Sequence, residues 1–260
     1  MMRAIIIGAG RGRRLAHLTT QIPKPLVPIV GRPMLDHVLA ALEEGGGLGR
    51  DCVTYICGYK GDVIRERYPD LNFVENPDWP HNNILLSLLY ARDELGRGQG
   101  FVSTYADIVY RAEAVRAAMD SPYDLTLVVD TDWRRRYVGR TEHPESDAEK
   151  VRFDSTGRIG QVSRTIAPDE ASGEFIGVFR ATATGARTFL DAFDDVRARF
   201  ADGAPFHEGR TFGKAYLIDL LQKMVEQGVA LHAAPIHGGY MEIDTTQDAA
   251  LAERWWSSNH

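Results

Sequence analysis

The chain has few of the residues that mark disulfide-bonded, metal-bound or nucleophilic sites. Among its 260 residues only Cys52 and Cys57 are cysteines, and the strand-like run CVTYIC should turn their side chains to opposite sides. This disfavours a disulfide and a CxxC redox pair, so we expect two reduced cysteines in or near a core strand. The eight histidines have no metal-binding spacing, and no Ser/His/Asp or Cys/His arrangement is legible.

Long apolar runs and a strong excess of one charge are also lacking. The apolar runs fall far short of the ~20 residues that span a bilayer, and a strand begins so early that no signal peptide fits before it. The net charge of −6 gives no general attraction to nucleic acid or to an anionic membrane. We therefore expect a cytoplasmic protein without nucleic-acid or membrane partners, in which any anion site is local.

Strands and helices alternate through the first half of the chain. With 44% hydrophobic and 25% charged residues, the composition is that of a globular protein with a full core. Apolar runs and helical spacing predict strand 3–10, helix 33–44, strand 52–57, helix 60–68, strand 72–76, helix 82–95, strand 100–107, helix 112–119 and strand 124–130. This alternation indicates βαβ units and a three-layer α/β fold with a mostly parallel sheet.

The pattern changes after Asp132. Short alternating runs joined by turn residues suit antiparallel pairing, and helices then return. The predicted elements are strands 150–154, 159–165 and 173–181, helices 183–200 and 214–228, strands 229–236 and 240–244, and a last helix 245–256. No repeat or linker divides the chain, so we expect a single domain over 1–260, with the antiparallel elaboration as a candidate surface for a homodimer.

A glycine-rich turn with three arginines follows the first strand. A dinucleotide fingerprint would need glycine at Arg13, and the G-K-[ST] of a P-loop is missing. Gly10 and Gly12 leave a flexible loop whose amides can approach a triphosphate, to which Arg14 and Lys24 would add positive charge. The alternative is a solvated basic turn, although Lys24 stands between two prolines that pin its backbone.

The stretch from Gly10 to Leu35 resembles the signature of the nucleotidyltransferase superfamily, which includes sugar-1-phosphate nucleotidylyltransferases and phosphocholine cytidylyltransferases. GRGRRL, PKPL and GRPML follow the patterns G-x-G-[TS]-R-L, P-K-[PA]-[LM] and G-[KR]-P-[ML] of that family. ADIVY and EIDTTQD resemble two of its later motifs, so the resemblance spans essentially the whole chain. The chain departs from the pattern at Arg13, where Thr or Ser is usual, and at Ala106, where Gly is usual.

The resemblance implies Mg²⁺-dependent transfer of a nucleotidyl group from an NTP to a phosphate or phosphonate, with release of pyrophosphate. It implies the Rossmann-like fold of nucleotide-diphospho-sugar transferases, with the NTP bound by residues 1–130 and the acceptor by residues 131–260. The NTP phosphates would meet the loop of Gly8, Ala9, Gly10, Gly12 and Arg13.

The resemblance also implies four charged site residues. Arg14 would hold the departing β- and γ-phosphates, and Lys24 would bridge toward the acceptor phosphate. Asp107 and Asp244 would hold Mg²⁺, for which carboxylates are usual ligands. Attack of one anion on another needs charge neutralisation and alignment, which such residues supply. Either aspartate could also cap the helix that follows it.

One segment resembles the cytidylyltransferase branch of the family more than the sugar branch. NPDWPHNNILLSLL is similar to a segment of phosphocholine and aminoalkylphosphonate cytidylyltransferases. We therefore expect Asn82, Asn83 and Ser87, together with Tyr59, at the nucleotide, with CTP as the favoured NTP. An amide offers a donor and an acceptor to a pyrimidine edge, and helix capping with a packed turn is the alternative.

The segment DTDWRRRY also resembles that branch. Asp130 and Asp132 would share one face if both are extended, and they could bind a cationic head group with Trp133 and Tyr137 as cation–π partners. They could instead hold a second metal, or belong to a polar loop with core aromatics. Glu174 lies on a strand similar to one that lines the acceptor pocket. A phosphocholine- or aminoalkylphosphonate-like acceptor is therefore expected.

Two other functions remain open at this stage. A sugar-1-phosphate nucleotidylyltransferase would use the same phosphate and metal residues. A catalytically silent nucleotide-binding regulatory module would share the fold. The chain has all four charged residues that the resemblance implies, and this argues against the silent module. They are Arg14, Lys24, Asp107 and Asp244.

Overall fold

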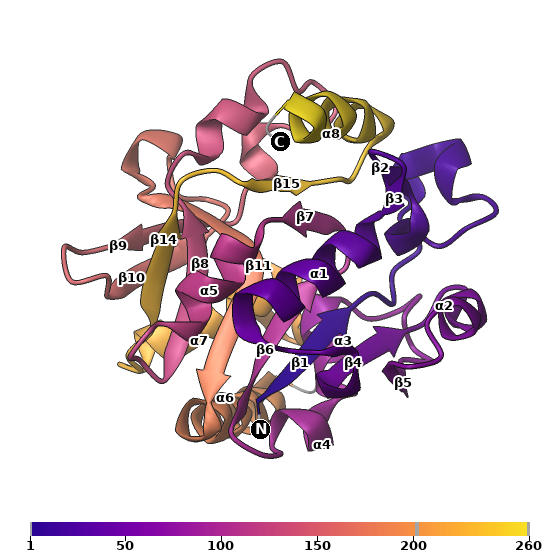
Figure 1. The fold of residues 1–260 in the computed structure, drawn as a ribbon. Helices are drawn as coiled ribbons and strands as arrows, with labels where there is room; N and C mark the ends of the chain where they lie inside the picture. Colours follow the sequence, from indigo (N-terminus) through magenta and orange to yellow (C-terminus); the bar gives the residue numbers. More distant parts are fainter. Residues whose placement is uncertain (1, 201–202, 259–260) are drawn as a thin grey trace.

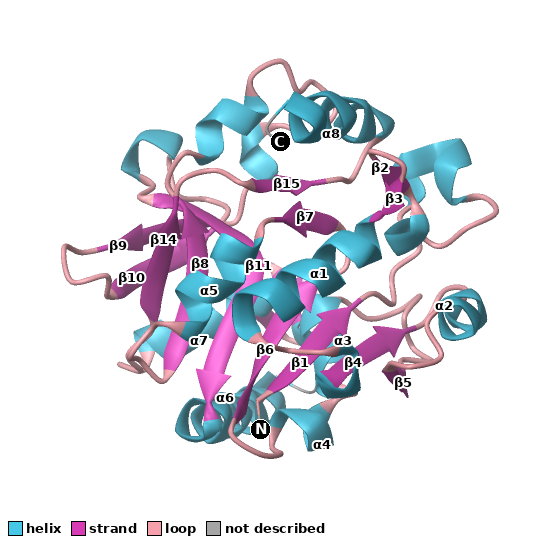
Figure 2. Cartoon of the chain, viewed as in Figure 1, coloured by secondary structure: helices cyan, strands magenta, loops and turns pink. Residues whose placement is uncertain are grey.

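A mixed β-sheet separates two layers of helices in the computed structural model, which describes residues 2–200 and 203–258 (Figures 1 and 2). Over these residues the sheet has nine strands: β1 (Arg3–Ile7), β4 (Val53–Cys57), β5 (Asn72–Glu75), β6 (Gly100–Tyr105), β8 (Leu125–Asp130), β9 (Lys150–Phe153), β10 (Ile159–Ser163), β11 (Gly173–Thr182) and β14 (His232–Ile236). The fold class expected from the sequence is confirmed.

The helices cover both faces of this sheet. In Figure 1, α1 (Met34–Gly46) and α5 (Ala112–Met119) cross in front of it. Behind it lie α3 (Ile84–Leu89), α6 (Ala183–Phe200) and α7 (Leu217–Glu226). The remaining helices are α2 (Gly61–Arg67), α4 (Arg92–Leu95) and α8 (Thr246–Ser258). None of the described helices is both long and apolar enough to cross a membrane.

The order of the strands creates a crevice at one edge of the sheet. β1 pairs in parallel with β4 on one side and with β6 on the other, and β4 pairs in parallel with β5. The chain therefore winds away from β1 in one direction and returns on its other side at β6. Ligands of open α/β sheets bind at the carboxyl ends of the strands where the winding reverses, which here are the ends of β1 and β6.

The second half of the chain completes the same sheet. β11 runs antiparallel to β6, β8 and β9, and β10 runs antiparallel to β9, as the alternating pattern predicted. β14 pairs in parallel with β8. Because β11 lies beside β6, the two halves share one hydrophobic core.

Three two-stranded ribbons surround the sheet. They are β2 (Pro28–Ile29) with β3 (Arg32–Pro33), β7 (Ile108–Tyr110) with β15 (Tyr240–Glu242), and β12 (Pro205–His207) with β13 (Arg210–Thr211). A second apolar cluster joins the first two ribbons to α8, and it includes Leu15, Val27, Met34, Met241, Ile243 and Trp256. This cluster holds together the segments that carry Lys24 and Asp244.

The predicted elements are present with a few differences in extent. The helix predicted over 82–95 is two helices, α3 and α4, because Ala91 between them has the backbone angles φ −90° and ψ 24°. The strand predicted to reach Asp107 ends at Tyr105, and β7, which follows Asp107, was not predicted. Cys52 and Cys57 are buried free thiols, as expected.

Candidate active site

The loop after β1 is shaped by two close backbone contacts. The Tyr55 hydroxyl donates a hydrogen bond of 3.1 Å to the Gly8 carbonyl, and a Cβ on Gly8 would lie only 1.9 Å from that hydroxyl oxygen. Gly12 has φ +67°, and a Cβ there would lie 2.7 Å from Cδ of Lys24. By contrast, nothing lies within 4 Å of the Cβ position of Gly10. The loop therefore packs against Tyr55 and Lys24 and leaves Gly10 open.

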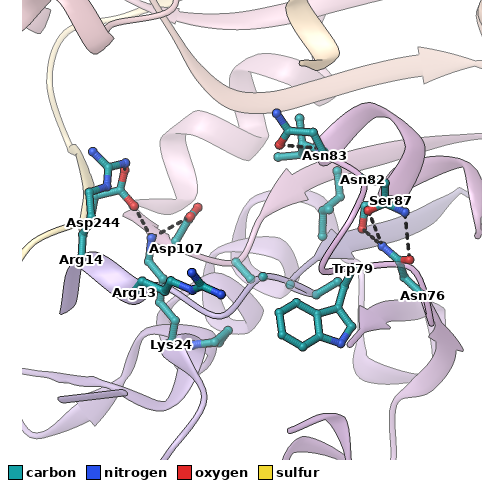
Figure 3. Close-up of a pocket in the computed structure, with 18 residues that line it drawn as sticks. Arg13, Arg14, Lys24, Asn76, Trp79, Asn82, Asn83, Ser87, Asp107 and Asp244 are labelled. Atoms are coloured by element: carbon teal, nitrogen blue, oxygen red, sulfur yellow. Dashed lines mark hydrogen bonds and ion pairs between the residues drawn. The ribbon is translucent and has the colours of Figure 1, made fainter. Parts of the chain in front are cut away.

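Lys24 connects the two carboxylates predicted to hold a metal. It begins the short 3-10 helix η2 (Lys24–Leu26) and is only 5% exposed. Its Nζ donates to Oδ2 of Asp107 at 2.8 Å and also pairs with Asp244. Arg14 pairs with Asp244 as well, and its Nη1 lies 3.3 Å from Oδ2 of Asp147. Figure 3 shows Arg14, Lys24, Asp107 and Asp244 gathered on one side of the cavity.

These contacts keep both partners charged. Burial alone would lower the pKa of Lys24, but Asp107 and Asp244 raise it above its ordinary value. Burial would raise the pKa of Asp244, but Lys24 and Arg14 lower it to about 2. At neutral pH the group therefore consists of ammonium, guanidinium and carboxylate ions that neutralise one another.

A third carboxyl group, that of Glu242, lies beside the aspartates. Burial and repulsion from Asp244 and Asp107 raise its pKa well above the usual range for a carboxyl. Nε2 of the buried His143 lies 3.4 Å from Oε2 of Glu242, and ligand atoms of His143, Glu242 and Asp244 lie within 4.8 Å of one another. The site thus gathers three carboxyl groups, whose hard oxygen donors are those that Mg²⁺ prefers, and a bound cation would favour the ionised form of Glu242.

Neither aspartate caps a helix. Asp248 accepts hydrogen bonds from the backbone N–H groups of Asp244 and Thr245 at 3.0 and 2.9 Å, and the Thr245 hydroxyl accepts from the Asp248 N–H at 3.1 Å. This reciprocal cap begins α8 and leaves the Asp244 carboxylate to its cations. The helix after Asp107 is α5, whose N-cap residue is Arg111.

The opposite side of the cavity is lined by amides and an indole (Figure 3). Asn76, which is fully buried, exchanges two hydrogen bonds of 3.1 and 3.0 Å with Asn82 and donates to Oγ of Ser87 at 3.1 Å. Asn83 accepts from the N–H of Ile84 at 2.9 Å and therefore caps α3. The expected binding residues thus have structural roles that also fix their positions in the wall.

The cavity has a volume of about 380 Å³. Its predicted site residues all come from loops or short elements that follow the strands. Twelve of the predicted site residues line the cavity: Gly8, Ala9, Gly10, Gly12, Arg13, Arg14, Lys24, Asn82, Asn83, Ser87, Asp107 and Asp244. Arg13 therefore faces the cavity, whereas Arg11 stacks over the ring of Tyr59 at 5.4 Å.

Three residues at or near the cavity wall differ from the prediction. Asn76 and Trp79 line the cavity, although only their sequence segment was singled out. The position of Asn76 directly after β5, at the carboxyl edge of the parallel strands, is the signal that could have identified it. Tyr59 is not among the wall residues but packs edge-on against Trp79, with ring centres 5.5 Å apart.

The residues predicted to bind the acceptor lie outside this cavity. Asp130 and Glu174 are buried and share Arg136, which pairs with Asp130 and lies 2.9 Å from Oε2 of Glu174. The hydroxyl of Tyr137 donates to Oε1 of Glu174 at 2.5 Å. Arg136 therefore already occupies both carboxylates as their cationic partner, in the place predicted for a cationic head group.

Asp132 and Trp133 also have other partners than the ones predicted. Asp132 has φ −98° and ψ 13°, so it is not extended and does not share a face with Asp130. Its carboxylate instead pairs with Arg135 at 3.2 Å near the surface. Trp133 is 2% exposed and packs with Tyr137 and Ala148 in a small apolar cluster, as in the core-aromatic alternative.

The fold and the charged cavity define a nucleotidyltransferase, and comparison with known proteins assigns the family. The sequence pattern described as the MobA-like NTP transferase domain matches residues 4–193. The chain belongs to this family and is an enzyme. The resemblance carried by the stretch from Gly10 to Leu35 is thereby confirmed.

Several relatives are cytidylyltransferases by name. The chain is 26% identical to the CTP:phosphoglutamine cytidylyltransferase of Campylobacter jejuni, over 95% of this chain and 97% of that protein. It is 36% identical to the 2-aminoethylphosphonate cytidylyltransferase of Lancefieldella rimae, over 43% of this chain and 45% of that protein. The solved CTP:phosphocholine cytidylyltransferase of Streptococcus pneumoniae has the same fold, with TM-score 0.70, 20% identity and coverage of 98% and 99% of the two chains.

Proposed function

We propose that this enzyme transfers CMP from CTP to a small phosphorylated or phosphonylated acceptor and releases pyrophosphate. The observation that carries the proposal is the cluster of Lys24, Arg14, Asp107 and Asp244 on one wall of a cavity whose other wall presents amides and an indole. The cytidylyltransferase names of the relatives support the choice of CTP.

In this proposal Asp107 and Asp244 hold Mg²⁺, with Glu242 beside them. The metal, when bound, would polarise the α-phosphate and neutralise developing charge. The donor set fits this ion, because it consists of carboxyl oxygens of Asp107 and Asp244 that meet at Lys24, with Glu242 next to them. About a third of the Asp107 side chain is exposed, so a cation can reach it.

The bond changes need no covalent enzyme intermediate. An oxygen of the acceptor phosphate or phosphonate attacks the α-phosphorus of CTP, and the bond from that phosphorus to the bridging oxygen of the β-phosphate breaks. Pyrophosphate leaves with the electron pair. Lys24 would hold the acceptor and α-phosphate oxygens together, and Arg14 would bind the leaving β- and γ-phosphates, so both cations exchange carboxylate partners for phosphate.

The nucleotide would lie along the glycine loop with its base toward Asn82 and Ser87. The open Cβ position of Gly10 leaves room for the triphosphate next to backbone amides. The hydrogen bonds between Asn76, Asn82 and Ser87 fix the wall before the nucleotide binds, which lowers the entropic cost of recognising the base.

A pyrophosphate-release screen tests the proposal. Four NTPs are combined with phosphorylated and phosphonylated amines, phosphoglutamine and several sugar-1-phosphates, in the presence of Mg²⁺. We expect release with CTP and a non-sugar acceptor. Release from UTP or dTTP with glucose-1-phosphate, and none with CTP, would instead assign a sugar nucleotidylyltransferase, and no release with any pair would favour the silent binding module.

A further inference from the structure

A second charged cluster begins at the end of β6, and it consists of Tyr105, Glu149, Arg164 and Tyr216. Tyr105 is the last residue of β6, two positions before Asp107. Its hydroxyl donates to Oε2 of Glu149 at 3.2 Å, and Nη2 of Arg164 lies 3.4 Å from Oε1 of Glu149. A short chain of contacts therefore links the strand that precedes Asp107 to Arg164.

The contacts of Arg164 also connect it to the wall of the cavity. Burial lowers the pKa of Arg164, but Glu149, Tyr216 and Glu242 raise it above its ordinary value. Arg164 stacks on Tyr216, and the carbonyl of Lys214, two residues before Tyr216, accepts a hydrogen bond of 3.0 Å from Nδ2 of Asn83 in the cavity wall. Arg164 is therefore linked to the wall through Tyr216 as well as to β6 through Glu149.

The donors of Arg164 are mostly unused. A guanidinium carries five N–H donors, yet over the described residues Arg164 makes one side-chain hydrogen bond, the long one to Glu149. Its Nε is buried without a hydrogen-bond partner. The guanidinium carbon stacks 4.1 Å from the ring centre of Tyr216, and 28% of the side chain is exposed. The guanidinium is therefore held between Glu149 and Tyr216 with unpaired donors, and part of the side chain is exposed.

Arg136, among the residues predicted to bind the acceptor, also has a buried Nε without a partner but differs in its exposure and its carboxylate partners. Arg136 is 7% exposed at its side chain and is engaged by both Asp130 and Glu174. The carboxylates that could have bound a cationic head group consequently already share a cation. The group with unpaired donors is therefore a cation, Arg164, and a cation can bind an anionic group of the acceptor.

We propose that Arg164 binds a carboxylate of the acceptor and selects phosphorylated or phosphonylated acceptors that carry a carboxylate besides the phosphoryl group. The planar fork of arginine matches a carboxylate in a bidentate manner. This inference rests on the proposed nucleotidyl transfer. Phosphoglutamine, named for the relative that matches nearly the whole chain, is an acceptor of this class, whereas phosphocholine and 2-aminoethylphosphonate have no carboxylate.

Acceptors that differ only in the carboxylate test this inference. The pairs are phosphoglutamine with its decarboxylated analogue N-phospho-4-aminobutanamide, and 2-amino-4-phosphonobutanoate with 3-aminopropylphosphonate. Pyrophosphate release from CTP is measured with Mg²⁺ for both members of each pair. We expect kcat/KM to be at least about tenfold higher for the carboxylated member of a reactive pair, as for the loss of a charge-assisted hydrogen bond.

The variant Arg164→Gln separates this role from a structural one. It should lower kcat/KM for the carboxylated acceptor by about 10- to 100-fold through KM for the acceptor, leave KM for CTP unchanged, and bring the ratio within each pair close to one. Arg164→Lys should give an intermediate ratio, because it keeps the charge but loses the fork. Arg3→Gln is the matched control, since Arg3 has a similar exposed fraction (27%) and a single carboxylate partner, Glu94, at 3.6 Å.

The outcomes distinguish this inference from the proposed function. Equal kcat/KM within each reactive pair, or an equal loss for both members in Arg164→Gln, would overturn the inference while leaving nucleotidyl transfer intact. The second result would mean that Arg164 contacts the phosphoryl group or only supports the fold. Absence of pyrophosphate release with every acceptor would overturn the proposed function, and the inference with it.

Discussion

At the scale of single residues, Lys24 holds the site together. Its buried ammonium faces Asp107 and Asp244, and the next carboxyl group is that of Glu242. Without Lys24 these acidic groups would repel one another in a place from which water is largely excluded. One side chain therefore stabilises the free enzyme and is poised to bind phosphate.

Lys24→Met should both destabilise and inactivate the enzyme. Removing one partner of a buried ion pair costs about 3–5 kcal/mol, because the aspartates are left uncompensated. Addition of Mg²⁺ should restore part of the lost stability, since a cation then replaces the ammonium. Thermal unfolding in EDTA and in Mg²⁺ checks this. Lys223→Met, which removes a lysine paired with Glu226 on α7, should show no such Mg²⁺ dependence.

Asp244 should make the stability depend on pH in the acid range. Its folded-state pKa of about 2 lies below the ~3.9 of an unfolded aspartate. The stabilisation is therefore fully present above pH ~4 and is lost as the pH falls through about 2; it amounts to about 2 kcal/mol. Denaturant unfolding of the wild type and of Asp244→Asn between pH 5 and 2 should show a smaller fall in the variant. Parallel curves would contradict this assignment.

The sequence predicted the charged residues of the cavity better than the acceptor residues. The four charged residues lie together because their motifs also fix the backbone. Prolines flank Lys24, and a reciprocal cap begins α8 directly after Asp244. The four residues are Arg14, Lys24, Asp107 and Asp244. The prediction for Asp130 assumed an extended chain up to Asp132, and the sequence did not reveal that Arg136 would turn inward. Such long-range pairing is set by packing, not by local pattern.

At the scale of elements, the loop after β1 and the segment around Lys24 act as one unit. The α-carbon of Gly12 faces the stem of Lys24, and φ +67° at this position is a conformation that glycine adopts without strain. The sequence predicts a flexible loop from Gly10 and Gly12, but the two glycines have different roles in the structure. Gly12 allows close packing, and Gly10 leaves open space.

Gly12→Ala should cost more than Gly10→Ala in stability. A left-handed backbone at a residue other than glycine costs about 1–2 kcal/mol, and the added Cβ would displace the Lys24 stem, so activity should fall as well. Gly10→Ala meets no neighbouring atom and should fold normally while raising KM for CTP. Thermal unfolding and steady-state kinetics of the two variants check both statements. Equal Tm values would contradict the role of Gly12.

Element types were predictable where local signals agree with packing. The buried parallel strands and the helices between them have continuous apolar runs and clear ends, so they are found near their predicted positions. The short strands β2, β3 and β7 were not predicted, because two or three residues have no usable periodicity, whereas β15 lies within the strand predicted over 240–244. Their pairing depends on α8 and the apolar cluster around it.

At the scale of the whole molecule, the two halves are mutually dependent. β6 of the first half has β1 on one side and β11 of the second half on the other. β7 pairs with β15 next to the site, and Asp107 and Asp244 come from opposite ends of the sequence. The site therefore exists only in the complete fold.

A fragment of residues 1–130 should not fold as a separate unit. It would expose the edge of β6 and the apolar surface that β11 covers, and an unpaired apolar edge promotes aggregation. Circular dichroism and size-exclusion chromatography of the fragment should show loss of native structure or aggregation, and the full chain should unfold in one transition. A monomeric, cooperatively folded fragment would contradict the single-domain prediction for residues 1–260.

The central claim is that the charged cavity transfers CMP to a phosphoryl acceptor. The most direct test incubates the enzyme with CTP labelled at the α-phosphate, Mg²⁺ and phosphoglutamine or another acceptor found in the screen, and follows the label. We expect the label in a CMP–acceptor adduct, in an amount equal to the pyrophosphate released, and no adduct with Asp107→Ala. Label that remains in CTP with every acceptor, or an adduct formed equally well by Asp107→Ala, would contradict the account.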